Sequence, residues 1–313
     1  APRLEAAWEF RRWQDGRVLS SQPMGEACQQ LYGAHCHVAH RGEMLALLRE
    51  ALPDDTVQLD RRCSGLHQDE HGATLMLSSR DGSTHELHAD VVIGADGIHS
   101  AVRPFVVPAD EARFSGLCAF RCLVPAAAAP AMALRPVQTL WLGPERHFVH
   151  YPISAGTLVN LVAIVPAGDW RNESWTAEGA IADLRAEFTG WDPRLHQLID
   201  AATETKRWAL FDRSPLARWT AGRVSLLGDA AHPMLPFFAQ GSAQAFEDAV
   251  VLAGCLAGAD AATAPQALQR YERIRRPRAS EVQLMSRGRE VRNHLPDGPA
   301  QQERDAQLAS GDP

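Results

Sequence analysis

The sequence lacks long apolar runs, paired cysteines and a strong charge imbalance, and each absence excludes a class of protein. The longest apolar run in the 313 residues is Ala249 to Ala259, far short of the ~18 residues that a membrane span needs. None of the six cysteines forms a C-x-x-C pair, so we expect reduced thiols and a cytoplasmic location rather than a disulfide framework. A net charge of −7 gives no reason to expect binding to nucleic acid or to a membrane.

The beginning of the chain also lacks familiar signals. Ala1 to Glu5 has neither the basic start nor the apolar stretch of a signal peptide, and the absence of an initial Met indicates processing or a fragment. A hydrophobic content of 45% and a charged content of 22% are typical of a soluble globular protein. At this length we expect two closely joined lobes.

The stretch Val224 to Ala257 predicts a ligand-binding edge. An apolar strand ends at Gly228, and Asp229 follows it, where open α/β sheets place ligand-binding groups. A proline-containing loop then leads to Gly241 and Ser242, which open a long helix. The free N–H groups and the positive dipole end of that helix would face whatever the loop encloses.

A second stretch repeats this arrangement. Asp90 to Ile93 is a continuous apolar strand, and Gly94-Ala95-Asp96-Gly97 follows it, ahead of a helical pattern. Asp96 therefore either contacts a ligand or only forms the turn beside Gly97.

An amphipathic helix is predicted after Arg41, because Met44 to Leu52 has apolar residues at helical spacing. A cation at the start of a helix opposes the dipole. Arg41 therefore either is solvated or faces an anion. The remaining expected elements are strands at 57–59, 73–77, 84–87 and 207–210, a β-rich region at 114–165, helices at 175–188, 193–201 and 265–292, and a mobile polar tail at 296–313.

Two other kinds of site receive little support. His35, Cys36, His37 and His40 are metal-ligand types, yet adjacent residues on a loop chelate poorly and no second pair has zinc-finger spacing, so we expect no metal. Serine-hydrolase chemistry would need a G-x-S-x-G turn, which the sequence lacks.

Taken together, the two ligand-edge motifs resemble those of the FAD-dependent aromatic hydroxylases. Asp90 to Arg103 resembles the family's DG motif, Gly222 to Asp248 its GD motif, and His40-Arg41 its His-Arg pair. The resemblance is strongest to the salicylate, 3-hydroxybenzoate and 6-hydroxynicotinate hydroxylases. The segments that carry this last likeness are 141–144, 151–152 and 158–161.

The resemblance implies an α/β fold with a Rossmann-like FAD-binding domain interleaved with a mainly β substrate domain and followed by a long C-terminal helix. It places the FAD-binding domain at 1–107 and 207–313 and the substrate domain at 108–206. By resemblance, Arg41 reaches the pyrophosphate and Asp229 the ribityl hydroxyls, while the loop 233–241 lies along the flavin ring. The residues assigned to FAD are Arg41, Asp96, Asp229, Pro236, Gln240, Gly241 and Ser242.

His147 and Tyr151 are the substrate-side candidates. On a strand they point to the same face, and family members acting on hydroxybenzoates have a His and a Tyr at this spacing. His147 would accept the phenolic proton, and Tyr151 would hydrogen-bond a substrate hydroxyl or carboxylate. The alternative is that His147 is a hydrogen-bonded sheet residue and Tyr151 an ordinary core aromatic.

One departure from the family is large, because the chain contains no G-x-G-x-x-G turn. The predicted reaction uses NADH or NADPH, O₂ and FAD, proceeds through a flavin C4a-hydroperoxide, and hydroxylates a small aromatic acid or phenol. The missing turn motivates an alternative, a flavin-free or inactive fragment that acts only as an interaction module. An oxidase or halogenase activity, the aromatic substrate, the nicotinamide preference and a homodimeric state stay open.

Overall fold

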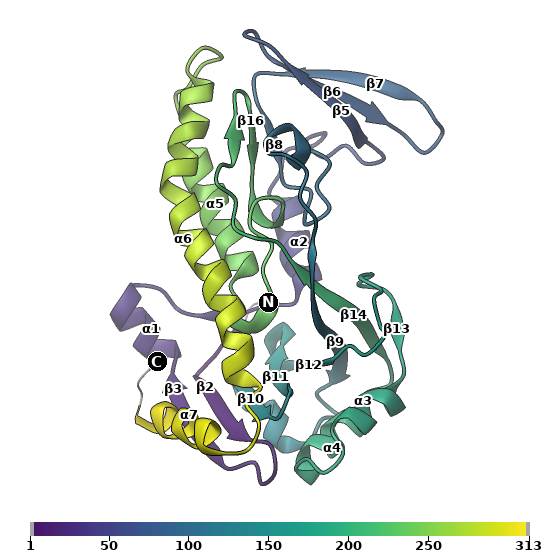
Figure 1. Cartoon of the computed structure of the whole chain (residues 1–313), viewed down its shortest axis with the longest axis vertical. Coiled ribbons are helices and arrows are strands. Elements are labelled where there is room, and N and C mark those ends of the chain that lie inside the picture. The colour runs from purple at the N-terminus through teal and green to yellow at the C-terminus, as the bar shows by residue number, and fades with distance from the viewer. Residues whose placement is uncertain (1–2, 311–313) are drawn as a thin grey trace. The chain divides into compact units, whose positions relative to one another are not determined.

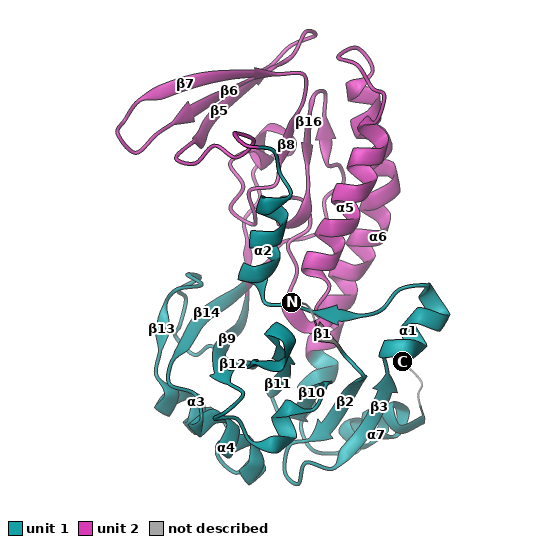
Figure 2. Ribbon diagram, turned by 180° about the vertical axis from the view of Figure 1, so that it is seen from behind, with its two compact units in different colours: residues 1–53, 115–210, 291–313 teal, residues 54–114, 211–290 magenta. Residues whose placement is uncertain are grey.

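The computed structural model describes residues 3–310, and the chain divides into two compact units (Figure 2). The first, here called the sheet unit, comprises residues 1–53, 115–210 and 291–313. The second, here called the motif unit, comprises residues 54–114 and 211–290. Each unit is described by itself.

The sheet unit is built on an eight-stranded sheet with the order β13-β14-β9-β12-β11-β10-β2-β3. Its central strands are β9 to β12, which pair antiparallel in the order β9-β12-β11-β10, whereas β2 runs parallel to β10. The strands are β2 (Ala7–Arg12), β3 (Val18–Pro23), β9 (Arg113–Pro125), β10 (Val137–Gly143), β11 (Arg146–Ile153), β12 (Leu158–Pro166), β13 (Glu178–Gly179) and β14 (Thr205–Asp212).

The two faces of this sheet differ in their cover. On one face the alternate residues are buried and mostly apolar, with His150 and Thr139 among them. On this face Phe148 packs edge-on against Phe188, which follows α3 (Ile181–Glu187), at a ring distance of 5.3 Å. Helix α4 (Pro193–Asp200) lies beside α3 (Figure 1). On the other face, Leu308 of α7 (Pro299–Ser310) packs in a small core with Phe10 and its neighbours in β10.

The motif unit has a three-stranded sheet with the order β15-β16-β8. Strand β16 (Val224–Leu226) runs parallel to β8 (Val92–Gly94) and antiparallel to β15 (Thr220–Ala221). Two helices, α5 (Gly241–Leu256) and α6 (Ala264–Asn293), run alongside each other (Figures 1 and 2). A separate antiparallel meander is formed by β5 (Arg62–Gln68), β6 (Ala73–Ser78) and β7 (Thr84–Ala89).

Several expected elements are confirmed, including the long helix, which runs from Ala264 to Asn293 with Pro277 inside it. The start of α5 at Gly241 and the predicted helix after Arg41, α2 (Arg41–Glu50), are confirmed too. The remaining short elements are α1 (Gly25–Tyr32), the paired β1 (Arg3–Leu4) and β4 (His37–Val38), and the 3₁₀ turns η2 (Ala131–Leu134) and η3 (Ser154–Gly156).

Four expectations are wrong. No strand forms at 57–59 within the described chain, because Asp55 and Asp60 have left-handed φ values of 67° and 57° and turn the backbone on both sides. The helix expected at 175–188 begins only at Ile181, since Glu178–Gly179 pairs with β14. The helical pattern after Gly97 yields only the 3₁₀ turn η1 (Arg103–Phe105). Residues 299–310 of the expected mobile tail form α7, with Leu308 only 3% exposed.

The assignment of 1–107 and 207–313 to FAD and of 108–206 to the substrate remains a prediction, because compactness does not report which unit holds a ligand. Residues 7–12 belong to the sheet unit since β2 hydrogen-bonds to β10, and α7 belongs to it through Leu308. Among residues 3–310, no helix is long and apolar enough to span a membrane.

Candidate functional site

The turns that carry Asp96 and Asp229 lie at the same edge of the motif-unit sheet. Leu226 pairs with Gly94 in the parallel β16–β8 ladder, and the Leu227 N–H donates to the Gly94 carbonyl at 2.9 Å. Because the strands are parallel, the two turns follow the same ends of neighbouring strands. The sequence placed each motif at a ligand edge, and the structure shows that the two turns share one edge.

The two aspartates have different surroundings. The Asp96 carboxylate accepts hydrogen bonds from the Ser100 hydroxyl at 2.5 Å and from the backbone N–H groups of Ala101 and Val102 at 2.7 and 3.3 Å. It therefore holds its own turn together, and its contact with FAD stays a prediction. Asp229 lies in the 3₁₀ turn η4 (Gly228–Ala230) with an exposed side chain. Its contact with FAD stays a prediction.

The loop between η4 and α5 ends in an uncapped helix. Pro236 begins the 3₁₀ turn η5 (Pro236–Phe238), and Ala239 then takes a left-handed φ of 52°. Gln240 is the N-cap residue of α5, and within the described residues no side chain caps this end. The N–H groups of Gly241 and Ser242 therefore keep their capacity to donate to an anion or a carbonyl.

Glycine at position 241 leaves room at this helix end. A Cβ added there would meet only one atom within 4 Å, the Met234 Cγ at 3.8 Å. A flat ring with carbonyl oxygens could approach the first turn of α5 without a clash, and the turn supplies the donors that such oxygens need. The residues present thus fit the flavin end of FAD.

A buried charge network fixes this loop, and the sequence prediction missed it. Asp248 of α5 is fully buried, and its carboxylate lies 2.6 Å from the His232 Nε2 and accepts from the Arg275 Nε at 2.8 Å and the Gly228 N–H at 3.1 Å. Arg275 also donates to the Gln244 side chain at 2.8 Å. Burial alone would raise the pKa of Asp248, but the hydrogen bonds from His232, Arg275 and Gly228 outweigh it and lower the pKa.

Helix α6 holds the loop backbone from its other side. The Gln283 amide donates to the Pro233 carbonyl at 2.8 Å, and the Ser286 hydroxyl donates to the Leu235 carbonyl at 2.5 Å. Both side chains are buried. A loop with its carbonyls bonded in this way is already ordered before any ligand binds, which reduces the entropy cost of binding.

Arg41, the residue predicted to reach the pyrophosphate, lies in the sheet unit at the first position of α2. Its guanidinium lies 5.6 Å from the centre of the Trp175 ring, which in turn stacks on Trp208 at 4.5 Å. Its side chain is exposed. The cation–π contact explains why a cation is tolerated at a helix start, and its contact with FAD stays a prediction.

His147 and Tyr151 also lie in the sheet unit, on one face of β11. His147 is only 4% exposed, and its Nδ1 lies 2.7 Å from the Nε2 of His294, which follows α6. Burial and the neighbouring ring hold the pKa of His147 well below its usual value, and burial together with Arg146 and Arg304 lowers the pKa of His294 to about 4. Both rings are therefore neutral near pH 7, and one donates to the other.

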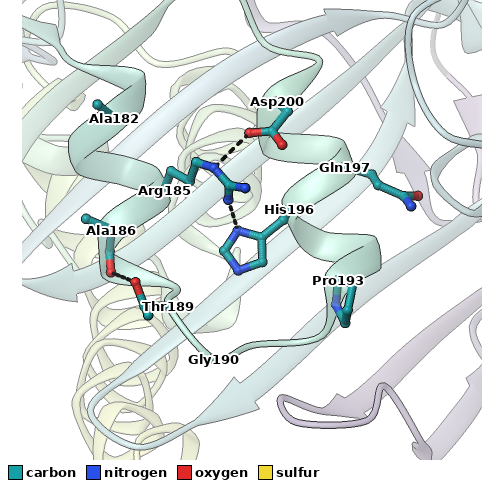
Figure 3. Close-up of a pocket in the computed structure, with 9 residues that line it drawn as sticks. All are labelled: Ala182, Arg185, Ala186, Thr189, Gly190, Pro193, His196, Gln197 and Asp200. Atoms are coloured by element: carbon teal, nitrogen blue, oxygen red, sulfur yellow. Dashed lines mark hydrogen bonds and ion pairs between the residues drawn. The ribbon is translucent and has the colours of Figure 1, made fainter.

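None of the predicted site residues lines the hollow on the helical side of the sheet unit (Figure 3). This hollow of about 700 Å³ lies between α3 and α4. Arg185 crosses it, bonded to His196 at 2.6 Å and to Asp200 at 3.3 Å. Over residues 3–310, no group of three or more His, Cys, Asp or Glu side chains could hold a metal ion.

In short, the predicted site residues fall in two groups. Those in the motif unit are Asp96, Asp229, Pro236, Gln240, Gly241 and Ser242. Those in the sheet unit are Arg41, His147 and Tyr151. The residues that support these groups, and that the sequence prediction missed, are His232, Asp248, Arg275 and His294, of which the first two stand inside the quoted GD motif.

The chain is similar to several known proteins. The model of the FAD binding domain family matches residues 20–286. The 3-amino-4-hydroxybenzoate 2-monooxygenase of Streptomyces platensis is 42% identical over 306 residues, which are 98% of this chain and 76% of that protein. The 6-hydroxynicotinate 3-monooxygenase of Pseudomonas fluorescens is 37% identical over 283 residues, covering 89% of this chain and 72% of that protein.

Two solved structures are also similar to this chain. Salicylate hydroxylase in a substrate complex is 28% identical with a TM-score of 0.82, covering 99% of this chain and 79% of that chain. The Klebsiella pneumoniae protein HpxO, complexed with FAD and uric acid, is 29% identical with a TM-score of 0.85, covering 99% and 77%. These matches confirm the expected α/β fold class, and this chain spans about three quarters of the length of these proteins.

Proposed function

The chain belongs to the FAD binding domain family and is an FAD-dependent aromatic monooxygenase, and we propose that it hydroxylates a small aromatic acid with NADH or NADPH and O₂. The observation that carries the proposal is the shared edge of the DG and GD turns beside the uncapped start of α5. The flavin-free alternative loses its support, because the similarity to named monooxygenases covers 98% of the chain.

FAD would be held by the motif-unit residues assigned above. Asp229 would bind the ribityl hydroxyls, and the N–H groups of Gly241 and Ser242 would face the pyrimidine end of the ring system. When bound and reduced, FAD supplies the oxygen-activating chemistry of the reaction. The positive end of the α5 dipole would favour negative charge at that end of the cofactor.

Two of the sheet-unit residues, His147 and Tyr151, would act on the substrate. His147 is neutral near pH 7, so one of its nitrogens is free of a proton and can accept one from a phenolic hydroxyl. His294, at 2.7 Å from the His147 Nδ1, holds the ring orientation. In the tautomer in which Nδ1 donates to His294, the Nε2 of His147 is the nitrogen that accepts the phenolic proton. A phenolate ring is more electron-rich than a phenol, which favours attack by an electrophilic oxygen.

The test starts with the whole protein and FAD. We expect FAD to bind, and NADH or NADPH oxidation to rise when hydroxybenzoates are added, with a hydroxylated product detected by mass spectrometry. Asp229→Ala should weaken FAD binding about 10- to 100-fold, the range for one charged hydrogen bond. Asp169→Ala removes an exposed carboxylate elsewhere and should leave FAD binding unchanged. An absence of both FAD binding and stimulated oxidation would overturn the proposal.

A further inference from the structure

Three polar residues gather on the His147 face of the sheet. Strand pairing places Tyr151 of β11 opposite Asn160 of β12, and Arg121 of β9 opposite Val162 of β12. Because residues that pair across strands share a face, Arg121, Asn160 and Tyr151 all lie on the face that carries His147. The cluster lies on three neighbouring strands of the sheet unit.

Arg121 has most of its hydrogen-bonding capacity unused. Its Nε donates to the Asn160 Oδ1 at 3.1 Å, and among residues 3–310 it forms no ion pair. Four of the five guanidinium N–H groups thus remain for another acceptor. Asn160 is 2% exposed, so the residue that orients Arg121 is itself fixed in the sheet. A guanidinium with an unused planar fork matches a carboxylate.

The His147 face of the sheet is partly exposed at the positions where the opposite face is buried. Arg121, Val149, Tyr151 and Val162 are all partly exposed. Their neighbours on the opposite face are closely packed: Phe120, Cys122, Phe148, His150 and Leu161 are each at most 3% exposed. A sheet buried on one face and open over a strip of the other leaves room for a small ligand on the open strip.

The polar and apolar side chains on this strip are arranged in a way that suits an aromatic acid. His147 and Tyr151 are four residues apart on β11, about 13 Å along the strand. Val149 lies between them on the same face, and Val162 lies opposite Val149. Arg121 is level with the valines, but its guanidinium bonds to Asn160, which lies opposite Tyr151. A ring lying over the two valines would direct a hydroxyl toward His147 and a carboxylate toward Tyr151 and this guanidinium.

We propose that Arg121 binds the carboxylate of the aromatic substrate, with Asn160 as its positioning residue, and that the site thereby selects aromatic acids over neutral phenols. Tyr151 would add a second donor to the same carboxylate. Burial raises the pKa of Tyr151, and the charge of Arg121 and a hydrogen bond with Asn160 only partly offset this rise, so the phenol stays protonated and able to donate. The inference rests on the proposed function, since it assigns one end of the same substrate site.

The experiment compares an acid with its neutral isostere. The probes are 3-amino-4-hydroxybenzoate and 3-amino-4-hydroxybenzamide, whose binding is followed by tryptophan fluorescence or calorimetry, and whose turnover is followed by KM and kcat. We expect the wild type to bind the acid more tightly than the amide. Arg121→Gln should weaken acid binding about 10- to 100-fold, leave amide binding nearly unchanged, and raise KM more than it lowers kcat.

Two further variants separate this role from a structural one. Arg121→Lys keeps the charge without the fork, so it should retain part of the preference for the acid. Arg80→Gln removes a cation whose side chain is 95% exposed and should change nothing. If Arg121→Gln melts at the wild-type temperature and still prefers the acid to the same degree, the inference is wrong. A wild type that turns over neither probe nor any other aromatic compound would count against the proposed function itself.

Discussion

Asp248 offers a sharp test of how the flavin loop is held. Asp248→Asn keeps the shape of the side chain and its ability to accept from the Gly228 N–H, but removes the charge that faces Arg275 at 2.8 Å. Arg275 is only 3% exposed, so water cannot replace the missing carboxylate. Its second carboxylate partner, Glu247, is partly exposed and also bonds to Arg278.

The expected loss of folding stability in Asp248→Asn follows from the burial of Arg275. Removing one partner of a buried ion pair costs about 3–5 kcal/mol, and Arg275 would keep only the partly exposed Glu247 as a carboxylate partner. Native proteins are stable by only about 5–15 kcal/mol, so the variant should lose a large fraction of its stability. Asp60→Asn is the matched control: Asp60 lies 3.7 Å from an Arg80 that is 95% exposed, and such a pair contributes less than about 1 kcal/mol.

The assay is urea unfolding of the whole protein at pH 7.5 and at pH 5, together with FAD titration. A carboxyl group whose pKa is lowered by folding contributes stability that is present above about pH 3.9 and is lost as the pH falls through its folded pKa. Both pH values lie above this range, so the carboxylate contributes its full stabilisation at each. The free energy of unfolding lost in Asp248→Asn should therefore be equal at the two pH values. The double variant Asp248→Asn/Arg275→Met should recover part of it. A single variant within 1 kcal/mol of the wild type would refute the reasoning.

Two other predictions concern the sheet unit. His294→Gln should reduce the acid sensitivity of folding: burial lowers the pKa of His294 to about 4, so the unfolded chain binds more protons below about pH 6.5 and stability falls between pH 6.5 and 4. Urea midpoints across this range should fall less steeply in His294→Gln than in the wild type. His71, whose ring is 86% exposed, provides the control, and His71→Gln should behave like the wild type. Equal slopes in His294→Gln and the wild type would contradict this prediction. Leu308→Ala should cost about 2–5 kcal/mol and speed hydrogen exchange in α7, whereas Leu284→Ala, 53% exposed, should cost under about 0.5 kcal/mol.

The sequence predicts local elements well where one pattern persists. Strand β16, the start of α5 and the length of α6 follow from apolar runs, glycine punctuation and helical spacing. These features depend on short-range sequence.

Contacts between distant residues could not be predicted in this way. Arg275 lies 27 residues after Asp248, and nothing in the spacing of either residue indicates the pair. Helix α7 was missed because its composition is polar, although its buried polar groups satisfy one another: the Arg304 Nε donates to Asp305 at 2.9 Å and its Nη1 to the Arg292 carbonyl at 3.0 Å. A polar composition therefore predicts an exposed helix only when its polar side chains find no hydrogen-bonding partners within the protein.

Both units combine a buried polar residue that fixes geometry with a more exposed one that is positioned for a ligand. In the motif unit, buried Asp248 holds the turn at Gly228, and exposed Asp229 is the next residue. In the sheet unit, buried Asn160 orients partly exposed Arg121. Replacing a buried member should therefore lower stability first, whereas replacing an exposed member should lower affinity with little change in melting temperature. Measuring both quantities for Asp248→Asn, Asp229→Ala and Arg121→Gln distinguishes residues that build the site from residues that bind in it.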